Sequence, residues 1–243
     1  MKEEDSIMTR VLSIDPGVRH LTWVEMTIPT EGMIRLHRWE IIDLLSPDLA
    51  IPRYDDYIYT TCSLWTKKQL ESFVSSVEES PLKDTKKRLF KKDYLSWIKT
   101  KYKCGRREVD IHILARRLID FLSITSFDEI DKLIIENQPA PKNPRMKSIQ
   151  TILMTYFMMK FPHVTIHFIP ASLKMSYCLK MKYIDKKPKG YSETKKSSIS
   201  VFENHILPKL QCDETKQQWN AAKKKDDLSD VILQGLAFSK KYV

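Results

Sequence analysis

The sequence predicts an α/β protein built on a mixed sheet, with antiparallel strands first and parallel strands later. Three strand patterns separated by short turns open the chain, which predicts an antiparallel meander. The later part alternates helical patterns with continuous apolar runs, which predicts parallel strands joined through helices. With 243 residues, of which 42% are hydrophobic and 30% charged, the chain can bury one sizeable core.

The first predicted strand, Arg10–Asp15, ends abruptly in a carboxylate. Val11, Leu12 and Ile14 form its apolar run, and an Asp-Pro-Gly sequence beginning at Asp15 breaks it. In α/β sheets, ligands and catalytic groups collect at the edge where the strands end. Asp-Pro-Gly is also an ordinary turn sequence. Asp15 therefore becomes a candidate site residue only if other acids reach the same edge.

Hydrophobic spacing and turn residues predict the remaining elements. Further strands are predicted over His20–Met26, Met33–Ile42, Asp131–Glu136 and His163–Ile169. Helices are predicted over Trp65–Val77, Val109–Ile124, Met146–Met159, Ser192–His205 and Asp226–Lys241. The lysine-rich segment from Tyr177 is predicted to be a mobile basic loop that runs into the helix beginning at Ser192. We expect a single domain over residues 1–243, interrupted by a basic insertion at about 53–107.

The charge of the chain favours a polyanionic partner. The formal net charge is +10, and between Lys83 and Arg107 eleven basic residues face two acidic ones. Four aromatic residues are interleaved with them, namely Phe90, Tyr94, Trp97 and Tyr102. One interpretation is a solvated helix whose aromatic stripe packs inward. The other is a nucleic-acid surface on which cations bind phosphates and aromatic rings stack or wedge.

Several classes of protein are disfavoured. No apolar run is long enough to span a membrane, and the acidic start Lys2–Asp5 does not resemble a secretory signal. The four cysteines are scattered without a Cys-x-x-Cys pair, so we expect neither a zinc site nor a disulfide framework, and a reducing intracellular setting. Only five glycines occur, and no Walker or dinucleotide-binding motif is present, so no nucleotide cofactor is expected.

The last predicted helix opens with three aspartates, Asp226, Asp227 and Asp230. Acids at a helix start commonly cap the helix and complement its dipole, and this is the simpler interpretation. Alternatively, Asp227 and Asp230 share one helix face at a spacing of three, while Asp226 and Asp230 do so at a spacing of four. With Asp15 and Glu136 at two strand ends, such a pair would bring four acids together. Four ionised acids require cations, and their oxygen ligands favour Mg²⁺ or Mn²⁺.

Four motifs in order resemble one family. They are Ser-Ile-Asp-Pro-Gly at 13–17, Ile-Glu-Asn-Gln-Pro at 135–139, Tyr191–Lys196 before a helix, and Lys-Asp-Asp-Leu-Ser-Asp at 225–230. Together they resemble the RuvC-like Holliday junction resolvases of the ribonuclease H-like superfamily, in particular the poxvirus and mitochondrial branch. The resemblance covers the chain ends and the half from 130 to 240, whereas the insertion has no counterpart.

The resemblance implies a ribonuclease H-like fold, with a five-stranded mixed sheet that has helices on both faces. It implies a homodimer that makes paired symmetric nicks in four-way DNA junctions, in recombination, repair or replication of viral DNA. Asp15, Glu136, Asp227 and Asp230 match the family's four acids and would hold two Mg²⁺ ions per site, with Mn²⁺ able to substitute. The expected location is the host cytoplasm for a viral protein, and otherwise the nucleus or mitochondrion.

Polar and basic residues near these motifs are expected to contact DNA. Asn137 stands where relatives often have arginine, which would shift a phosphate contact to Lys142 or Arg145. Lys195 and Lys196 begin a helix directed at the site, although simple surface solvation explains them equally well. The full set of expected DNA contacts is Gln138, Lys142, Arg145, Lys147, Lys186, Lys187, Lys189, Lys195 and Lys196.

Three other functions compete with junction resolution. In a non-catalytic basic DNA-binding protein, the acids would only cap helices. A ribonuclease H-like nuclease could instead cleave an RNA–DNA hybrid or a flap. An actin-like kinase also opens with a strand carrying Asp-x-Gly, but the scarcity of glycine and the missing second phosphate loop argue against it.

Overall fold

The computed structural model describes residues 8–29, 34–46, 62, 65–77, 80–82, 88–102, 110–139, 141, 143–210 and 213–242. The chain divides into two compact units. The first, which we call the sheet unit, consists of Met1–Ile42 and Phe127–Val243. The second, the helical unit, consists of Asp43–Ser126. No described helix has the length and apolar character needed to cross a membrane.

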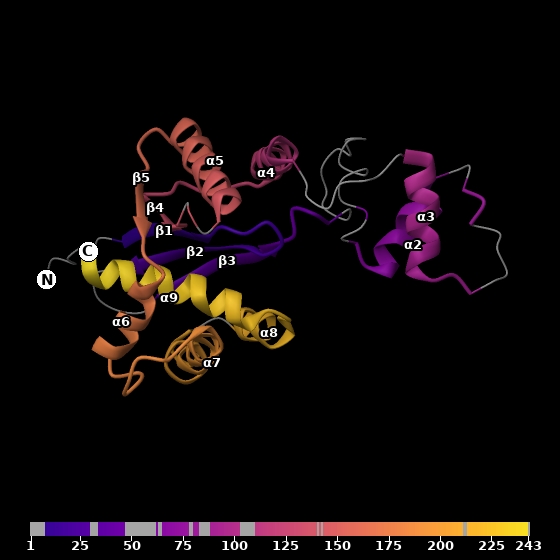
Figure 1. The fold of residues 1–243 in the computed structure, drawn as a ribbon. Coiled ribbons are helices and arrows are strands. Elements are labelled where there is room, and N and C mark those ends of the chain that lie inside the picture. Colours follow the sequence, from indigo (N-terminus) through magenta and orange to yellow (C-terminus); the bar gives the residue numbers. More distant parts are fainter. Residues whose placement is uncertain are drawn as a thin grey trace, which may run out of the picture. The chain divides into compact units, whose positions relative to one another are not determined.

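The sheet unit is built on a five-stranded mixed sheet in the order β3-β2-β1-β4-β5 (Figure 1). Strand β2 pairs antiparallel with β1 and β3, whereas β4 runs parallel to both β1 and β5. The strands are β1 (Met8–Asp15), β2 (Leu21–Pro29), β3 (Arg35–Ile42), β4 (Lys132–Glu136) and β5 (Thr165–Ile169). The predicted fold class, a mixed α/β sheet with a meander followed by parallel strands, is confirmed.

Residues of the central strands alternate between the two faces of the sheet, as the pleat requires. Val11, Val24 and Met26 belong to a cluster with the C-terminal helix α9 (Lys225–Tyr242). On the other face, Trp23 packs edge-on against Phe127, and Phe127 packs against Phe157 of helix α5 (Pro144–Lys160). Helices α5 and α9 therefore cover opposite faces of the sheet (Figure 1).

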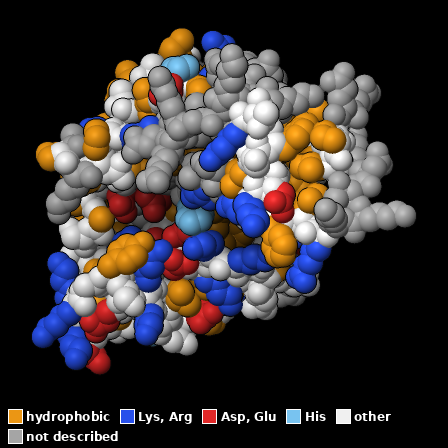
Figure 2. Space-filling model, turned by 45° about the vertical axis from the view of Figure 1, so that its right-hand side comes forward, with side chains coloured by type: hydrophobic (Ala, Val, Ile, Leu, Met, Phe, Trp, Pro, Cys, Tyr) orange, Lys and Arg blue, Asp and Glu red, His pale blue; other side chains and the backbone are white. Residues whose placement is uncertain are grey.

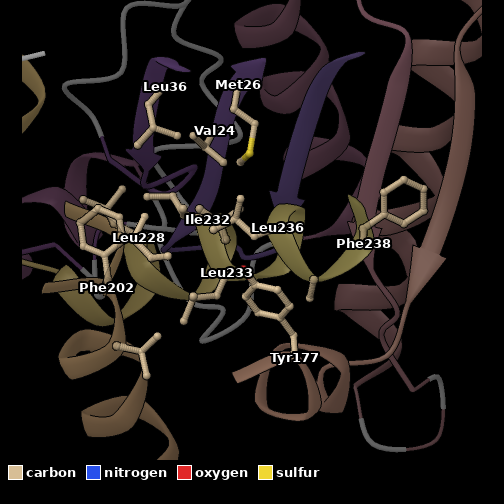
Figure 3. Close-up of a cluster of buried hydrophobic side chains, with 14 of the residues drawn as sticks. Val24, Met26, Leu36, Tyr177, Phe202, Leu228, Ile232, Leu233, Leu236 and Phe238 are labelled. Carbon is tan, nitrogen blue, oxygen red and sulfur yellow. The ribbon is translucent and has the colours of Figure 1, made fainter. Parts of the chain in front are cut away.

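Helix α9 packs closely on the sheet. Leu228, Ile232 and Leu236 of the helix meet strand residues such as Val24 and Met26 in the buried cluster (Figure 3). A Cβ atom added to Gly235 would lie 2.8 Å from Met26 Cε and 3.1 Å from its Sδ. The absence of a side chain at this position thus allows the helix to approach β2.

Two hydrogen bonds fix α9 along β1. Ser13 Oγ donates to the Val231 carbonyl at 2.9 Å, and Gln234 Nε2 donates to the Ile14 carbonyl at 3.0 Å. Both side chains are buried, so these bonds are shielded from competition with water. They set the position of the helix relative to the end of β1, where Asp15 lies.

The remaining helices of the sheet unit follow β5. They are α6 (Ser172–Lys180), α7 (Tyr191–Val201), a π-helical turn (Phe202–Ile206), a 3₁₀ turn (Leu207–Lys209) and α8 (Asp213–Ala221). The prediction of a basic loop from Tyr177 is wrong for residues 177–180, because Tyr177 and Cys178 are buried in α6. The predicted helix over Ser192–His205 changes into the π-helical turn at Phe202. Helix α8 was not predicted, and its Trp219 is fully buried against Phe202.

The helical unit contains helices α2 (Lys67–Ser76), α3 (Lys91–Tyr102) and α4 (Ile111–Ile124). Thr66 and Gln69 form a capping box at the start of α2. Arg117 is 1% exposed, and it donates hydrogen bonds to the carbonyls of Leu44 (2.8 Å) and Ser46 (2.6 Å). The predicted insertion at 53–107 lies within this wider unit. The assignment of the whole chain to one domain stays a prediction.

Replacement of Gln234 by leucine should destabilise the sheet unit. The substitution removes the buried donor to Ile14, so we expect the free energy of unfolding to fall by about 1–3 kcal/mol. Urea titration followed by circular dichroism measures this change. The matched control is Gln217→Leu on α8, because Gln217 is exposed and its substitution should change stability by less than about 0.5 kcal/mol. Equal effects of the two substitutions would contradict the role of Gln234.

Candidate functional site

The four acids predicted from the sequence line one cavity of about 760 Å³. Asp15 ends β1, Glu136 ends β4, and Asp227 and Asp230 lie in the first turns of α9. Because Ile14 pairs with Ile135 in parallel register, Asp15 and Glu136 lie side by side at the carboxyl-terminal ends of β1 and β4. Acids separated by up to 215 positions in the sequence therefore meet in one place.

The face of the sheet also favours this meeting. Asp15 has the same parity along β1 as Ser13, which is hydrogen-bonded to α9, and Glu136 has the same parity along β4 as Ile134, which packs in the α9 cluster. Both strand acids are thus on the side of the sheet that α9 covers. The turn between β1 and β2, which begins directly after Asp15, is tight. A Cβ atom at Gly17 would lie 2.4 Å from the His20 carbonyl oxygen, so this turn requires a residue without a side chain.

Lys174 of α6 lies among the acids, and sequence reasoning missed it. Its Nζ is 2.6 Å from Asp230 Oδ2 and 3.7 Å from Glu136 Oε2, and the residue is only 7% exposed. A lysine is almost never buried unless its charge is paired. One signal was present in the sequence: Lys174 follows the end of β5 by five positions, and β5 ends at the same edge as β1 and β4.

Lys195 of α7 binds the acids at the start of α9. Its Nζ donates to Asp227 Oδ1 at 3.2 Å and also forms an ion pair with Asp226. His20 Nδ1 lies 3.7 Å from Asp227 Oδ2 on the far side of that carboxylate. Asp227 lines the cavity and Asp226 does not. The geometry therefore favours Asp227 and Asp230 as the pair that faces Asp15.

The electrostatics of the cluster indicate a shortage of positive charge. Burial, followed by repulsion from Glu136, raises the pKa of Asp15 well above its ordinary value, and Lys174 only partly opposes this. Burial also raises the pKa of Glu136 against the opposing effect of Lys174. Burial alone would lower the pKa of Lys174, but Asp230 and Glu136 raise it, so the lysine stays charged.

Two carboxylate oxygens in the cavity lack hydrogen bonds. Asp227 Oδ2 and Asp230 Oδ1 are buried and accept none from the described part of the chain. Buried acceptors without a partner are costly, and in native structures they often mark a site for water or an ion. Acidic side chains gather on the face of the molecule that Figure 2 displays.

The donor set fits a hard divalent cation by its chemistry. Carboxylate oxygens are the ligands that Mg²⁺ and Mn²⁺ prefer, and two of those in the cavity accept no hydrogen bond from the described residues. As the described side chains stand, no group of three or more His, Cys, Asp or Glu residues is arranged to hold a metal ion. The ammonium groups of Lys174 and Lys195 lie between the acids and partly supply the missing charge. A bound cation would share that role with them.

The predicted DNA-contacting residues differ in their placement. Gln138, Lys187 and Lys195 line the cavity. Lys147 donates hydrogen bonds to Asn137 Oδ1 at 3.2 Å and to Gln150 Oε1 at 3.3 Å. Of the other predicted contacts that the structure describes, Lys186, Lys189 and Lys196 are exposed and Arg145 is half-buried, and none of these four lines the cavity. Lys142 is outside the described residues.

Comparison with known sequences gives one distant relative. No protein-family model matches the chain. An uncharacterised protein of Acanthamoeba polyphaga mimivirus is 27% identical over 184 residues, which cover 72% of this chain and 41% of that protein. The chain thus spans less than half the length of this curated relative.

Comparison with solved structures identifies the fold. The yeast mitochondrial Holliday junction resolvase Ydc2 is similar with a TM-score of 0.52 and 14% identity, over 96% of this chain and 79% of that chain. The fold is that of a RuvC-like Holliday junction resolvase. Thermus thermophilus RuvC has a TM-score of 0.40 and 10% identity, over 97% of this chain and 96% of that one. The structure of that RuvC in complex with a Holliday junction substrate has a TM-score of 0.41 and 10% identity, over 96% of each chain.

The RuvC-like fold accounts for the arrangement of the motifs seen in the sequence. The motif at 13–17 ends β1, the motif at 135–139 ends β4, and the motif at 225–230 begins α9. All three open onto the cavity. The family resemblance drawn from these motifs is therefore confirmed at the level of the fold.

The raised pKa of Asp15 predicts that stability depends on pH. Because the folded-state pKa lies above the ordinary value of 3.8, the stabilising contribution is complete below that value and is lost as pH rises through the raised pKa. The thermal midpoint of metal-free protein should fall over this range, and Asp15→Asn should reduce the fall. Added Mg²⁺ should raise the midpoint most at the upper end of the range, where the carboxylates are ionised.

Thermal unfolding followed by circular dichroism, with EDTA or with Mg²⁺, measures these effects. The control is Asp185→Asn, because Asp185 is exposed and does not line the cavity. If Asp15→Asn and Asp185→Asn changed the pH dependence of the thermal midpoint equally, the assignment of that pH dependence to the acid cluster would be wrong.

Proposed function

We propose that the chain is a metal-dependent endonuclease that resolves four-way DNA junctions by paired, symmetric nicks. The observation that carries the proposal is the convergence of Asp15, Glu136, Asp227 and Asp230 on one cavity at the edge of a RuvC-like sheet. Similarity to a Holliday junction resolvase of known structure supports the choice of substrate. A non-catalytic DNA-binding protein would have no need of four largely buried acids in one cavity.

The four acids would together hold two Mg²⁺ ions, for which Mn²⁺ can substitute. When bound, such ions lower the pKa of an attacking water and stabilise the leaving oxygen, which is the chemistry of in-line phosphodiester hydrolysis. The oxygens of Asp227 and Asp230 that accept no hydrogen bond support these two residues as ligands. Asp226 forms an ion pair with Lys195 but does not itself line the cavity, which supports a different role for Asp226.

The two lysines would act differently in this site. Lys174 contacts Asp230 and Glu136 from a buried position, so we assign it the role of holding both carboxylates in place. Lys195 is less buried, and its Nζ lies 4.9 Å from the ring centroid of Tyr191, which also lines the cavity. Lys195 would therefore exchange its contact with Asp227 for a contact with a substrate phosphate.

The partner proposed for this site is branched DNA, bound by a homodimer of the chain. The net charge of +10 favours a polyanion and predicts that binding weakens steeply with salt. Gln138, Lys187 and Lys195 line the same cavity as the acids and would contact the substrate there. We further propose a role in recombination, repair or replication of viral DNA, with action in the host cytoplasm. Similarity to a mimivirus protein supports the viral setting alone.

Asp227→Asn should abolish cleavage of a mobile four-way junction while leaving junction binding intact. The substitution removes a negative charge from the proposed metal site, and we expect the nicking rate to fall about 100- to 1000-fold, in line with losses seen when a key charge-stabilising group is removed. The assay follows nicks in each labelled strand, with Mg²⁺ or with EDTA. The matched control is the adjacent Asp226→Asn, which should keep most of the activity.

The same assay separates the competing functions. Symmetric nicks in the junction that require both Mg²⁺ and Asp227 support the proposal. Preferential cleavage of an RNA–DNA hybrid or a flap would assign a different substrate to the same site. Binding without nicking on any substrate would leave a non-catalytic DNA-binding protein. A larger loss of nicking in Asp226→Asn than in Asp227→Asn would make Asp226, rather than Asp227, the site residue that acts with Asp230.

A further inference from the structure

Helix α3 of the helical unit has two distinct faces. Tyr94 is 7% exposed and Ile98 is fully buried, so this side of the helix belongs to the interior of the unit. Helices α2 and α3 lie side by side (Figure 1). The Tyr94 hydroxyl donates to Glu71 Oε1 of α2 at 3.0 Å. The inward-packing interpretation of the basic, aromatic segment is therefore correct for Tyr94.

Phe90, just before the start of α3, is exposed. It is 55% exposed, although it has no polar group to hydrate. Its backbone N–H donates to Asp93 Oδ2 at 2.7 Å, which fixes the residue at the helix start. Arg88 and Lys92 lie over its ring, 5.9 and 6.0 Å from the centroid. An exposed aromatic ring thus lies close to two cations.

The charge around Phe90 favours a polyanion. Arg88, Lys91, Lys92 and Lys99 are exposed on α3 or just before it, whereas the acidic residue there, Asp93, accepts the Phe90 hydrogen bond. Phosphates attracted by these cations would lie beside the ring. Single-stranded nucleic acid offers phosphates and open base faces together, and aromatic side chains among basic ones bind it by stacking. Paired bases in a duplex do not present such faces.

We infer that Phe90, with Arg88 and Lys92, forms a surface that binds unpaired DNA bases and their flanking phosphates. The helical unit would thereby favour DNA with unstacked bases, such as a branch point, over continuous duplex. This inference extends the proposed function, because it names a second contact for the same substrate. It does not depend on the acid cluster, since every residue involved belongs to the helical unit.

The test measures binding of the full chain to a single-stranded oligonucleotide, a blunt duplex and a four-way junction, by fluorescence anisotropy in EDTA. Phe90→Leu keeps an apolar side chain but removes the ring. It should weaken single-strand binding roughly 5- to 150-fold, the loss expected for one stacked base, and change duplex binding by less than about twofold. Phe90→Trp should restore single-strand binding. Arg88→Ala with Lys92→Ala should weaken binding to all three DNAs and reduce the salt slope by roughly 2.

Two control variants come from the same unit. Ile111→Ala removes apolar surface from a residue that is 39% exposed, and Lys67→Ala removes a lysine paired with Glu71 at 3.3 Å. Neither should change the preference for single strands. The inference is overturned if Phe90→Leu binds single strands like the wild type, or if it loses duplex binding to the same extent.

The outcomes for this surface and for the nuclease are separable. With enzyme in excess over the junction, the control Lys67→Ala should nick at the wild-type rate, whereas Asp227→Asn should bind single strands like the wild type without nicking. If the chain nicks junctions and Phe90→Leu binds single strands like the wild type, the inferred surface is contradicted and the proposed function stands. If single-strand binding depends on Phe90 and the chain never nicks DNA, the proposed function is contradicted and the inferred surface stands.

Discussion

Largely buried carboxylates at one sheet edge repel each other unless positive charge lies among them, and this constraint shapes the cavity. Lys174 is nearly inaccessible to solvent and lies between Asp230 and Glu136, and Lys195 supplies a second charge at Asp227. The compensation is incomplete, because the pKa of Asp15 is still raised by burial and by its acidic neighbours. A cluster in this condition gains stability from any cation that reaches it.

The positions of the four acids depend on contacts between other residues. The parallel register of β1 and β4 places Asp15 beside Glu136, and the bonds of Ser13 and Gln234 hold α9 against β1. Gly235 allows the close approach of the helix to Met26. Substitutions far from the cavity can therefore move Asp227 and Asp230 away from Asp15. The helix core and the acid cluster act as one structural element.

The helical unit presents a different balance of forces. Its described core is apolar with a few satisfied polar groups, such as Arg117, whose guanidinium donates to backbone carbonyls. The exposed side of α3 is basic, and an exposed ring, Phe90, lies just before the helix. Repulsion between like charges along such a face works against folding, and a polyanion bound there would relieve it. The two units thus differ in charge: the sheet unit has an acidic cavity, and the helical unit has a basic surface with an exposed aromatic ring.

The elements of the sheet unit could largely be predicted from local sequence patterns. Alternating and continuous apolar runs identify β1 to β5, and the acids that end β1 and β4 are visible as breaks in those runs. Helix α6 was missed because its buried residues, including Met175 and Cys178, are scattered among lysines and polar residues. With it went Lys174, whose role depends on the neighbours that the fold brings to it.

The amino-acid sequence by itself determined which side chains can take part: three aspartates at a helix start, two acids at strand ends, and a basic segment with aromatic residues. Local spacing allows Asp230 to pair with either Asp226 or Asp227, and it does not say which aromatic residue of the basic segment is exposed. In the tertiary structure Asp227 lines the cavity and Asp226 does not, while Phe90 is exposed and Tyr94 is buried. The direction of a side chain from a helix depends on how that helix is rotated against its neighbours, and that rotation is set by contacts with residues distant in the sequence.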